Sequence, residues 1–365
     1  MNVENCHNST AKCWLIYAMG GGWGHLVRAL ALGRIAGTCR PVLILCNSPY
    51  AADILLYAAG EEPQPIVEGC YLEAIPHTAS FDETRDRVRE VIFQNPHDLL
   101  IVDTFPRGLG GELADLLPQM KSTPRVFVHR DLDPNYVRAK DLSRFVAENF
   151  ELILIPGTLE DPPLAHLPQV RRTAPWSIRT ASELPDRATA RQFLRLNPQD
   201  DTPAIVVLAA GRDEELQVYG ELTVALAQAF PQAMVRCLSA ERPPQCPPSL
   251  WVFHWPGIEC LPAADVVVGG GGYNSVYECV AVGVPLVAFA FARQYDRQGR
   301  RLLRANAAVR WVEDIPGAIA AVAQFLRDPG TREPRSSAFV NGAVEAVNLI
   351  VEAIADGESN ATGNQ

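Results

Sequence analysis

The sequence AADVVVGGGGYNSVYECVAVGVP at residues 263–285 joins an apolar run, four consecutive glycines and a mixed polar and apolar segment. Val266 to Val268 end a β-branched run, which is typical of a parallel strand covered on both faces. Gly269 to Gly272 carry no side chains, so the backbone can turn sharply there and approach a ligand closely. The stretch therefore predicts a buried strand, a glycine loop and a helix.

The predicted helix has plausible signals at both ends. Asn274 and Ser275 stand at its start, where short polar side chains can cap free backbone N–H groups. Gly283 suits a left-handed C-terminal position, and Pro285 prevents continuation. The free N–H groups and the dipole of a helix start favour an anion. A phosphate or diphosphate is the predicted ligand, and a tight turn without a ligand is the alternative interpretation.

Three further polar residues are spaced so that they can lie near the same loop. Glu278 follows Ser275 by one helical turn, so its carboxylate can lie beside a bound ligand, for example against ribose hydroxyls. Asp296 and Gln298 follow the next predicted strand, Leu286 to Ala290. Because the carboxyl ends of parallel strands meet at one edge of the sheet, these side chains should reach the same place. The spacing favours a ligand site over a simple turn.

These residues carry a resemblance to a known family. The segments Gly272-Tyr-Asn-Ser-Val-Tyr-Glu278, Gly283-Val-Pro285 and Asp296-Arg-Gln298 resemble the donor-binding signature of GT-B glycosyltransferases, especially the MurG-type family and the plant-type UDP-sugar transferases. The resemblance implies an α/β protein with two Rossmann-like domains, whose parallel sheets face each other across a cleft. It also implies that the final helix returns to the first domain.

The same resemblance implies roles for individual residues. The loop of Gly270, Gly271, Gly272, Asn274 and Ser275 would bind the donor diphosphate, and Glu278 the ribose. Asp296 and Gln298 would contact sugar hydroxyls. No cofactor is implied, because the nucleotide-sugar is itself a substrate.

Two positions depart from the family pattern. Gly270 stands where the plant-type signature has a histidine, and Gly299 stands where the MurG-type signature has a second glutamine. The first departure removes any contact that the imidazole makes, and the second leaves the donor sugar open. Retaining GT-B enzymes resemble each other in a Glu-x7-Glu pair, but the position eight residues before Glu278 is Gly270. Inversion at the anomeric carbon is therefore the expected stereochemistry.

The composition limits the class of protein. A chain of 365 residues is long enough for two domains. The net charge of -10 speaks against a nucleic-acid partner. We expect no transmembrane segment and no signal peptide, although peripheral contact with a membrane stays open. The nine cysteines are scattered without a Cys-x-x-Cys pair, which favours reduced thiols and a cytoplasmic location.

The first half of the chain opens with a second glycine loop. Cys13 to Met19 predict a strand, and Gly20-Gly-Gly-Trp-Gly-His-Leu-Val-Arg28 predict a loop leading into a helix. A dinucleotide fingerprint fails here, because the third glycine would fall at His25 and the next strand ends in Asn47, where an acidic residue should hold the ribose.

His25 is the predicted general base. It lies at the carboxyl edge of the first strand on a glycine platform, and an imidazole accepts a proton readily near neutral pH. The loop resembles the Gly-Gly-x-Gly-Gly-His loop of the MurG-type family, which places Gly22, Trp23 and Gly24 on the acceptor side. It also resembles the Gly-x-Gly-His-x-x-Arg loop of a nucleotide-sugar hydrolase. A helix-capping histidine is the alternative interpretation.

Asp103 is the predicted partner of His25. It follows the strand at Asp98 to Val102, and a carboxylate there can orient an imidazole and stabilise its protonated form. Ordinary loop polarity is the alternative. Asp131-Leu-Asp133 spells an Asp-x-Asp pair that holds a metal in GT-A transferases. We interpret it as a strand-end loop, because the donor signature lies in the other half, and expect no essential metal.

The second half restarts the α/β pattern at Ala204. Gly211 and Arg212 follow that strand, and Arg212 could reach the diphosphate or simply be solvated. His254 lies where this fold usually holds the nucleotide base. We expect domain boundaries at residues 1–197, 198–335 and 336–365, with a disordered tail from Glu358.

The overall expectation is an inverting, metal-independent transferase that moves a sugar from a nucleoside diphosphate, in particular a UDP-sugar, to an unknown acceptor hydroxyl or amine. A nucleotide-sugar hydrolase on the same fold and a non-catalytic nucleotide-sugar-binding subunit are the alternatives.

Overall fold

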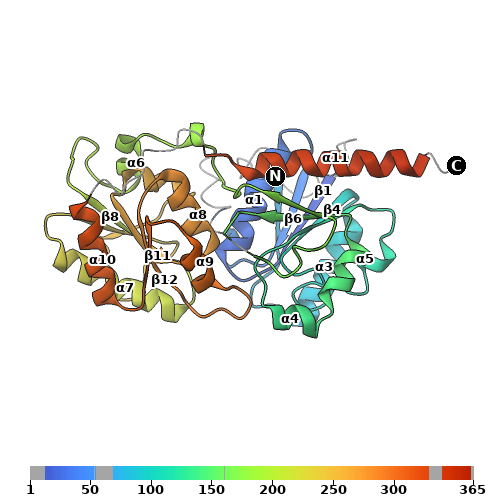
Figure 1. The fold of residues 1–365 in the computed structure, drawn as a ribbon, viewed down its shortest axis with the longest axis horizontal. Coiled ribbons are helices and arrows are strands. Elements are labelled where there is room, and N and C mark those ends of the chain that lie inside the picture. The colour runs from blue at the N-terminus through green and yellow to red at the C-terminus, as the bar shows by residue number, and fades with distance from the viewer. Residues whose placement is uncertain (1–12, 53, 55–68, 160, 329–338, 363–365) are drawn as a thin grey trace. The chain divides into compact units, whose positions relative to one another are not determined.

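The chain folds into two compact units. The computed structural model describes residues 13–52, 54, 69–159, 161–328 and 339–362 (Figure 1). The first unit comprises residues 1–178 together with 341–365, and the second comprises residues 179–340. The first boundary thus follows Ile178, earlier than the boundary that we expected after residue 197. The reason is that helix α6 (Arg187–Phe193) packs on the 3-10 helix η4 (Gly257–Ala263) of the second unit.

The first unit is built on a seven-stranded parallel sheet in the order β3-β2-β1-β4-β5-β6-β7. Every residue of β1 and β2 is buried, as expected for apolar strands covered on both faces. In the register, Tyr17 of β1 lies between Leu45 of β2 and Val102 of β4. The strands are β1 Cys13–Ala18, β2 Val42–Cys46, β3 Cys70–Ala74, β4 His97–Asp103, β5 Arg125–Val128, β6 Leu152–Pro156 and β7 Val170–Thr173.

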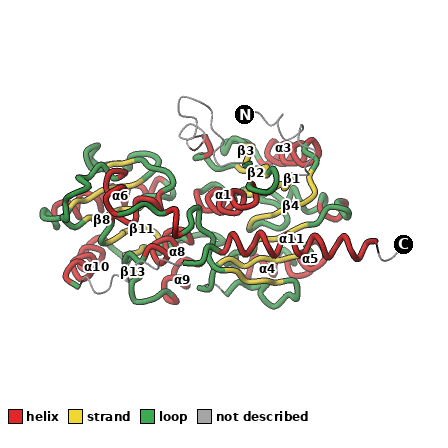
Figure 2. The backbone as a smooth tube through the Cα atoms, turned by 90° about the horizontal axis from the view of Figure 1, so that it is seen from above, coloured by secondary structure: helices red, strands yellow, loops and turns green. Residues whose placement is uncertain are grey.

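Helices alternate with these strands, and the chain's last helix joins them. α11 packs against α1, β6 and β7, and Figure 2 shows it alongside the first unit's strands. Asn341, just before α11, donates from Nδ2 to the Ser177 carbonyl at 2.7 Å. The expected return of the final helix is confirmed. The helices are α1 Trp23–Gly37, α3 Phe81–Gln94, α4 Pro134–Ala139, α5 Leu142–Asn149 and α11 Gly342–Thr362, with the 3-10 helix η2 Leu117–Gln119.

Helix α11 buries only one face, and it is longer than expected. Its buried face contains Ala343, Ala346 and Ile350, whereas Val344 and Val351 are each 43% exposed. The helix also continues to Thr362, so the prediction of disorder is wrong for residues 358–362. Residues 363–365 lie outside the described part of the chain.

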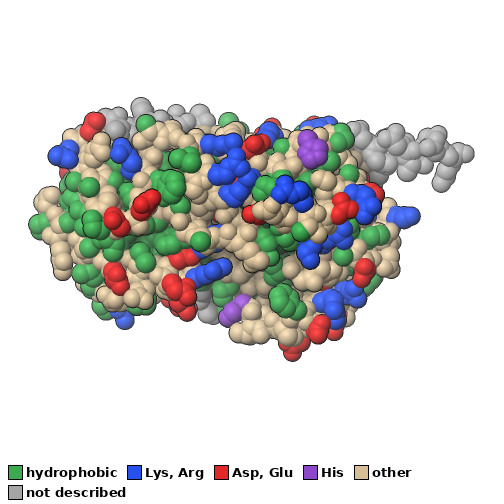
Figure 3. Space-filling model, turned by 60° about the horizontal axis from the view of Figure 1, so that its bottom comes forward, with side chains coloured by type: hydrophobic (Ala, Val, Ile, Leu, Met, Phe, Trp, Pro, Cys, Tyr) green, Lys and Arg blue, Asp and Glu red, His purple; other side chains and the backbone are tan. Residues whose placement is uncertain are grey.

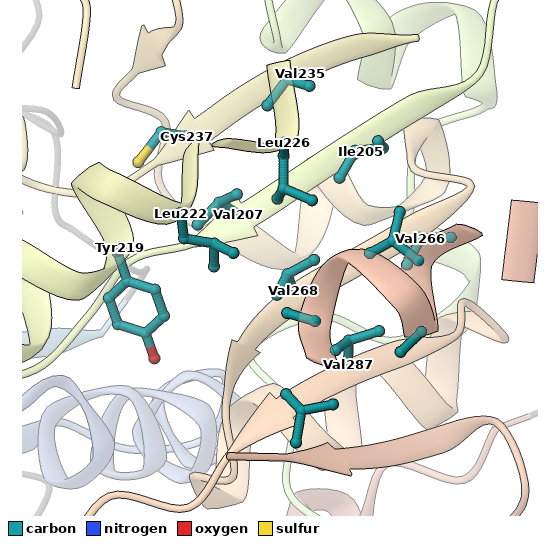
Figure 4. Packing of buried hydrophobic residues seen from close by; sticks show 14 of the residues in the cluster. Ile205, Val207, Tyr219, Leu222, Leu226, Val235, Cys237, Val266, Val268 and Val287 are labelled. Atoms are coloured by element: carbon teal, nitrogen blue, oxygen red, sulfur yellow. The ribbon is translucent and has the colours of Figure 1, made fainter. Parts of the chain in front are cut away.

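The second unit has a six-stranded parallel sheet in the order β10-β9-β8-β11-β12-β13. Its core gathers valines of β8, β11 and β12 under α7, as Figure 4 shows for Val207, Val268 and Val287. The elements are β8 Ala204–Leu208, β9 Met234–Leu238, β10 Trp251–Val252, β11 Val266–Gly270, β12 Leu286–Phe289, β13 Val309–Val312, α7 Asp213–Ala229, α8 Tyr273–Val282, α9 Gln298–Arg304, α10 Ile315–Arg327 and η3 Ala181–Glu183.

Each sheet reverses its strand order at one point, and each glycine loop lies there. In the first sheet the reversal falls between β1 and β4, and in the second between β8 and β11. Connections leave to opposite sides at such a point, so a crevice opens beyond the carboxyl ends of the strands, where open parallel sheets bind ligands. The loop after β1 carries His25, β4 ends at Asp103, and the glycine loop follows β11.

The surface agrees with the composition. Over the face in Figure 3, the described Asp and Glu side chains are interspersed with Lys and Arg, without a continuous basic surface of the kind that nucleic acids require. A search of the described helices found no span with the length and apolarity needed to cross a membrane.

Candidate active site

The loop after β1 presents His25 on the first turn of α1. Gly22 is the N-cap of α1, and no described side chain caps the helix. Gly20 has φ 154°, and a Cβ there would lie 2.3 Å from the His25 ring. Only glycine fits this position, because the imidazole packs directly on the backbone. His25 therefore does not act as a helix cap, and its ring has a defined place.

His25 is paired with Asp103, as the sequence predicts. The Nδ1 atom of His25 lies 2.6 Å from the Oδ2 atom of Asp103. The Asp103 side chain is 4% exposed and the His25 side chain 21% exposed. Phe105 stacks on the imidazole with ring centroids 5.7 Å apart. The carboxylate is thus enclosed while one edge of the imidazole remains open to a substrate.

Arg28 is a third member of this cluster, and the sequence-based expectation did not include it. Its Nε and Nη2 atoms donate to the two carboxylate oxygens of Asp103 at 2.9 and 2.7 Å. Its Nη1 atom donates to the Gly24 carbonyl at 3.0 Å. The signal was present in the spacing, because Arg28 follows His25 by three residues and so shares its helix face.

The cluster keeps Asp103 ionised. Burial alone would raise the pKa of Asp103, but the charge of Arg28 and the hydrogen bonds from His25 and Arg28 lower the pKa well below its usual range. An ionised carboxylate accepts hydrogen bonds and cannot donate them, so the proton between the two residues belongs to Nδ1 of His25. The Nε2 atom of a neutral His25 therefore carries the lone pair that can accept a proton.

The other acceptor-side residues have structural partners in the same loop. Trp23 stacks on Tyr50 with centroids 4.4 Å apart and an interplanar angle of 9°. The Gly22 amide donates to the Gly20 carbonyl at 2.8 Å. Gly24 contributes its carbonyl to Arg28. Trp23 and Tyr50 are both half-buried, so a partly exposed aromatic pair belongs to the loop that carries His25.

In the second unit, the glycine loop opens a helix with free amides. β11 ends at Gly270, and Gly272 is the N-cap of α8. Asn274 and Ser275 do not cap this helix as expected, because they lie inside its first turn; no described side chain takes that role. A Cβ on Gly271 would lie 2.9 Å from Leu302. The free N–H groups of the first turn favour an anion.

Glu278 lies one turn further along α8. It is half-buried, and it has no hydrogen bond or ion pair with any residue that the structure describes. Burial raises the pKa of Glu278 to about 8. A carboxyl group left without a partner at this depth is available to a ligand hydroxyl.

Asp296 and Gln298 are tied to the same loop through the protein. Asp296 accepts from Arg301 Nη2 at 2.6 Å, and Arg301 Nη1 donates to the Gly271 carbonyl at 2.8 Å. Gln298 is buried, and its Oε1 accepts from the Phe291 amide at 3.1 Å. Asp296 thus lies at the glycine loop, whereas the Gln298 oxygen already serves the backbone.

The remaining donor-side residues separate into different environments. Arg212 is exposed at the start of α7. Gly211 has φ 151°, and a Cβ there would lie 1.9 Å from the Glu215 carboxylate. His254 stacks on Phe193 at 4.2 Å, and its Nε2 lies 2.8 Å from Glu259. His254 is therefore held by the protein itself.

The second acidic pair has a local role. Asp133 caps α4 by accepting from the Asn135 amide at 2.6 Å, and Asp131 is buried. Within the described residues, no cluster of His, Cys, Asp and Glu has the arrangement of a metal site. Asp131 and Asp133 lie between β5 and α4, which is the strand-end loop that the sequence predicts.

Comparison with solved structures identifies the fold. Streptomyces sp. SF2575 glycosyltransferase SsfS6 in complex with thymidine diphosphate matches with a TM-score of 0.60 and 16% identity, over 93% of this chain and 99% of that chain. Arabidopsis thaliana UGT89C1 in complex with UDP-L-rhamnose matches with a TM-score of 0.61 and 16% identity, over 95% and 99%.

Acinetobacter baumannii MurG also matches, with a TM-score of 0.53 and 13% identity over 93% of this chain and 99% of that one. No protein-family model and no curated protein sequence matches the chain. At these identities the structural similarity establishes the fold alone. The chain has the GT-B glycosyltransferase fold.

Proposed function

We propose that this protein is an inverting glycosyltransferase that moves a sugar from a nucleoside diphosphate, in particular a UDP-sugar, to an acceptor hydroxyl or amine. The observation that carries the proposal is the His25–Asp103 pair, at 2.6 Å between Nδ1 and Oδ2, at the strand-order reversal of the first sheet. A buried carboxylate that fixes the tautomer of a half-open imidazole is the arrangement of a general base.

The donor side is supported by α8 and its loop. The Gly270, Gly271 and Gly272 backbone leads into free helix amides, which suit a diphosphate. Glu278 offers an unengaged carboxyl group to the ribose. The bound nucleotides of two structural neighbours, thymidine diphosphate and UDP-L-rhamnose, belong to the same chemical class.

The proposed reaction balances as a single displacement. The acceptor oxygen or nitrogen forms a bond to the anomeric carbon while the bond from that carbon to the diphosphate oxygen breaks. His25 Nε2 takes the acceptor's proton, and the diphosphate leaves with the bonding electron pair. Loop amides and the start of α8 stabilise the charge that develops on the leaving group, so the proposed mechanism is metal-independent. Gly270 leaves no second carboxylate eight residues before Glu278, which favours inversion.

A nucleotide-sugar hydrolase is the second candidate, and one observation favours it. Arg28 is the arginine of the Gly-x-Gly-His-x-x-Arg motif, which resembles a loop of a nucleotide-sugar hydrolase. Arg28 also donates directly to Asp103. In that reaction a water molecule replaces the acceptor, and His25 takes the water proton.

Incubation with UDP-sugars, with and without an acceptor panel, separates the candidates. Sugar release that requires an acceptor supports the transferase, whereas rapid release into water supports the hydrolase. In either case His25→Ala should lower kcat by about 10²–10⁴-fold while the Kd for the nucleotide changes little. His166→Ala is the matched control, because His166 is exposed in the segment between β6 and β7 of the same unit. Unchanged turnover in His25→Ala would refute the assignment of the base.

A further inference from the structure

A second charged cluster lies beside the donor loop and is not explained by the signature residues. Arg293, on the loop between β12 and α9, forms a two-armed ion pair with Glu215 of α7, in which Nη2 lies 2.5 Å from Oε2. Tyr219 follows Glu215 by four residues and therefore lies on the same helix face. The ring of Tyr219 contacts Phe291 edge-on, with centroids 5.6 Å apart.

Two glycines of the second unit, Gly211 after β8 and Gly270 at the end of β11, lie against this cluster. The Glu215 carboxylate takes the space of a side chain at Gly211, 1.9 Å from the Cβ that residue would have. The Tyr219 hydroxyl takes the space of a side chain at Gly270, 3.0 Å from its would-be Cβ. Gly211 follows β8, and Gly270 is the last residue of β11; these two strands lie at the point where the strand order reverses. The cluster therefore packs against the backbone at residues 211 and 270, next to the proposed donor site.

The Tyr219 hydroxyl is an unused donor. Tyr219 is fully buried, and within the described part of the chain its oxygen has no hydrogen-bond partner. Figure 4 shows the hydroxyl directed away from Leu222 and Val207 of the apolar cluster. Burial, and then the charge of Glu215, raise the pKa of Tyr219, so the group keeps its proton at neutral pH. Buried hydroxyls almost always have a partner, so this one points to a ligand or a bridging water.

Arg293 adds a positive charge at the same place. Its side chain is 23% exposed, and its bonds to Glu215 use only part of the N–H donors of a guanidinium. Its charge is felt by both Tyr219 and Asp296, so it lies near the loop that Asp296 borders. Arg212, the cation expected for the diphosphate, is instead exposed at the start of α7.

We propose that Arg293 and Tyr219 form a second phosphate-binding element of the donor site, with Glu215 holding the guanidinium in position. This inference rests on the proposed function, because it assigns further contacts to the same diphosphate. The charge of Glu215 is offset by Arg293, and the remaining guanidinium N–H groups and the tyrosine hydroxyl are donors for phosphate oxygens. A side chain at position 270 would crowd the Tyr219 hydroxyl, because its Cβ would lie 3.0 Å from that oxygen.

Calorimetric titration with UDP, TDP, uridine and inorganic pyrophosphate tests the inference on full-length variants. Arg293→Gln should weaken UDP or TDP binding about 10–100-fold, and Tyr219→Phe about 3–10-fold, with little change for uridine. Arg300→Gln is the control, since it removes the same charge from an exposed position on α9 and should leave affinity unchanged.

If Arg293→Gln does not fold, Tyr219→Phe still tests the inference. Removing a buried hydroxyl that has no partner among the described residues should not lower the melting temperature. A merely structural tyrosine predicts unchanged nucleotide affinity in that variant. The inference is overturned if wild-type protein binds UDP or TDP and folded Arg293→Gln and Tyr219→Phe bind it equally well. Wild-type protein that binds no nucleoside diphosphate would refute the proposed function itself and this inference with it.

Discussion

Replacing Asp103 by asparagine should lower stability, and its effect on catalysis should depend on how the new amide turns. The Asp103 carboxylate accepts from Nδ1 of His25 at 2.6 Å and from Nε and Nη2 of Arg28 at 2.9 and 2.7 Å. Asparagine has only one acceptor oxygen to offer. If its NH₂ group faces His25, the imidazole must present its Nδ1 lone pair, and the proton moves to Nε2. That tautomer cannot take a proton from the acceptor, and kcat should fall by about 10²–10⁴-fold.

Stability falls in either orientation. Asparagine is neutral, so the buried Arg28 guanidinium loses its ionised partner, which costs about 3–5 kcal/mol and lowers the melting temperature by roughly 6–20 °C. If the NH₂ group instead replaces Oδ1 and faces Arg28 Nε, the amide oxygen still accepts from Nδ1 of His25, and the tautomer is kept. His25→Ala is the matched control, because it removes the base while the Asp103–Arg28 pair remains. Turnover measured with and without acceptor, together with calorimetric melting, gives both readouts. An Asp103→Asn variant with wild-type turnover and wild-type melting temperature would refute the account of this cluster.

Three further predictions concern pH and the donor loop. Because the pKa of Asp103 is lowered in the folded protein, the Asp103 carboxylate is protonated first in the unfolded chain as pH falls. The free energy of unfolding should therefore decrease below about pH 4. In urea titrations, this decrease should be smaller for Asp103→Asn. The pKa of Glu278 is raised from 4.5 to about 8, so wild-type protein should lose stability relative to Glu278→Gln as pH rises between those values. Glu278→Gln should also weaken UDP binding by about tenfold in calorimetry, and equal affinity would contradict the ribose contact. Gly271→Ala places a Cβ 2.9 Å from Leu302, whereas the Cβ of the control Gly272→Ala meets nothing within 4 Å. Gly271→Ala should therefore lower nucleotide affinity more than Gly272→Ala. Similar losses of affinity for both variants would contradict the close fit of Gly271.

Much of the fold could be predicted because its signals are local. Apolar β-branched runs such as Val266 to Val268 form buried parallel strands, and Gly283, with φ 75°, ends α8 as expected. The position of the first domain boundary could not be read from proline content, since it depends on α6 packing against η4, a contact between segments far apart in the sequence.

The site was predictable only in part. The pairing of His25 with Asp103 followed from the rule that strand ends meet at one edge of a sheet. Glu215 and Arg293 were missed as cluster members, because the sequence does not show which charged residues turn inward. Arg28 was missed although its spacing from His25 places both on one face of the helix. Asn274 and Ser275 were expected to cap α8, but the helix begins at Tyr273, two residues earlier than Ser275. Such shifts of one or two residues are common at helix ends.

The most direct test of the central claim compares nucleoside diphosphates with the matching nucleosides. We expect UDP or TDP to bind measurably in calorimetry, and uridine and thymidine to bind at least about 100-fold more weakly, because charge-assisted bonds from the glycine loop and the start of α8 go to the diphosphate. Equal binding of nucleotide and nucleoside, or no binding of any nucleoside diphosphate, would contradict it.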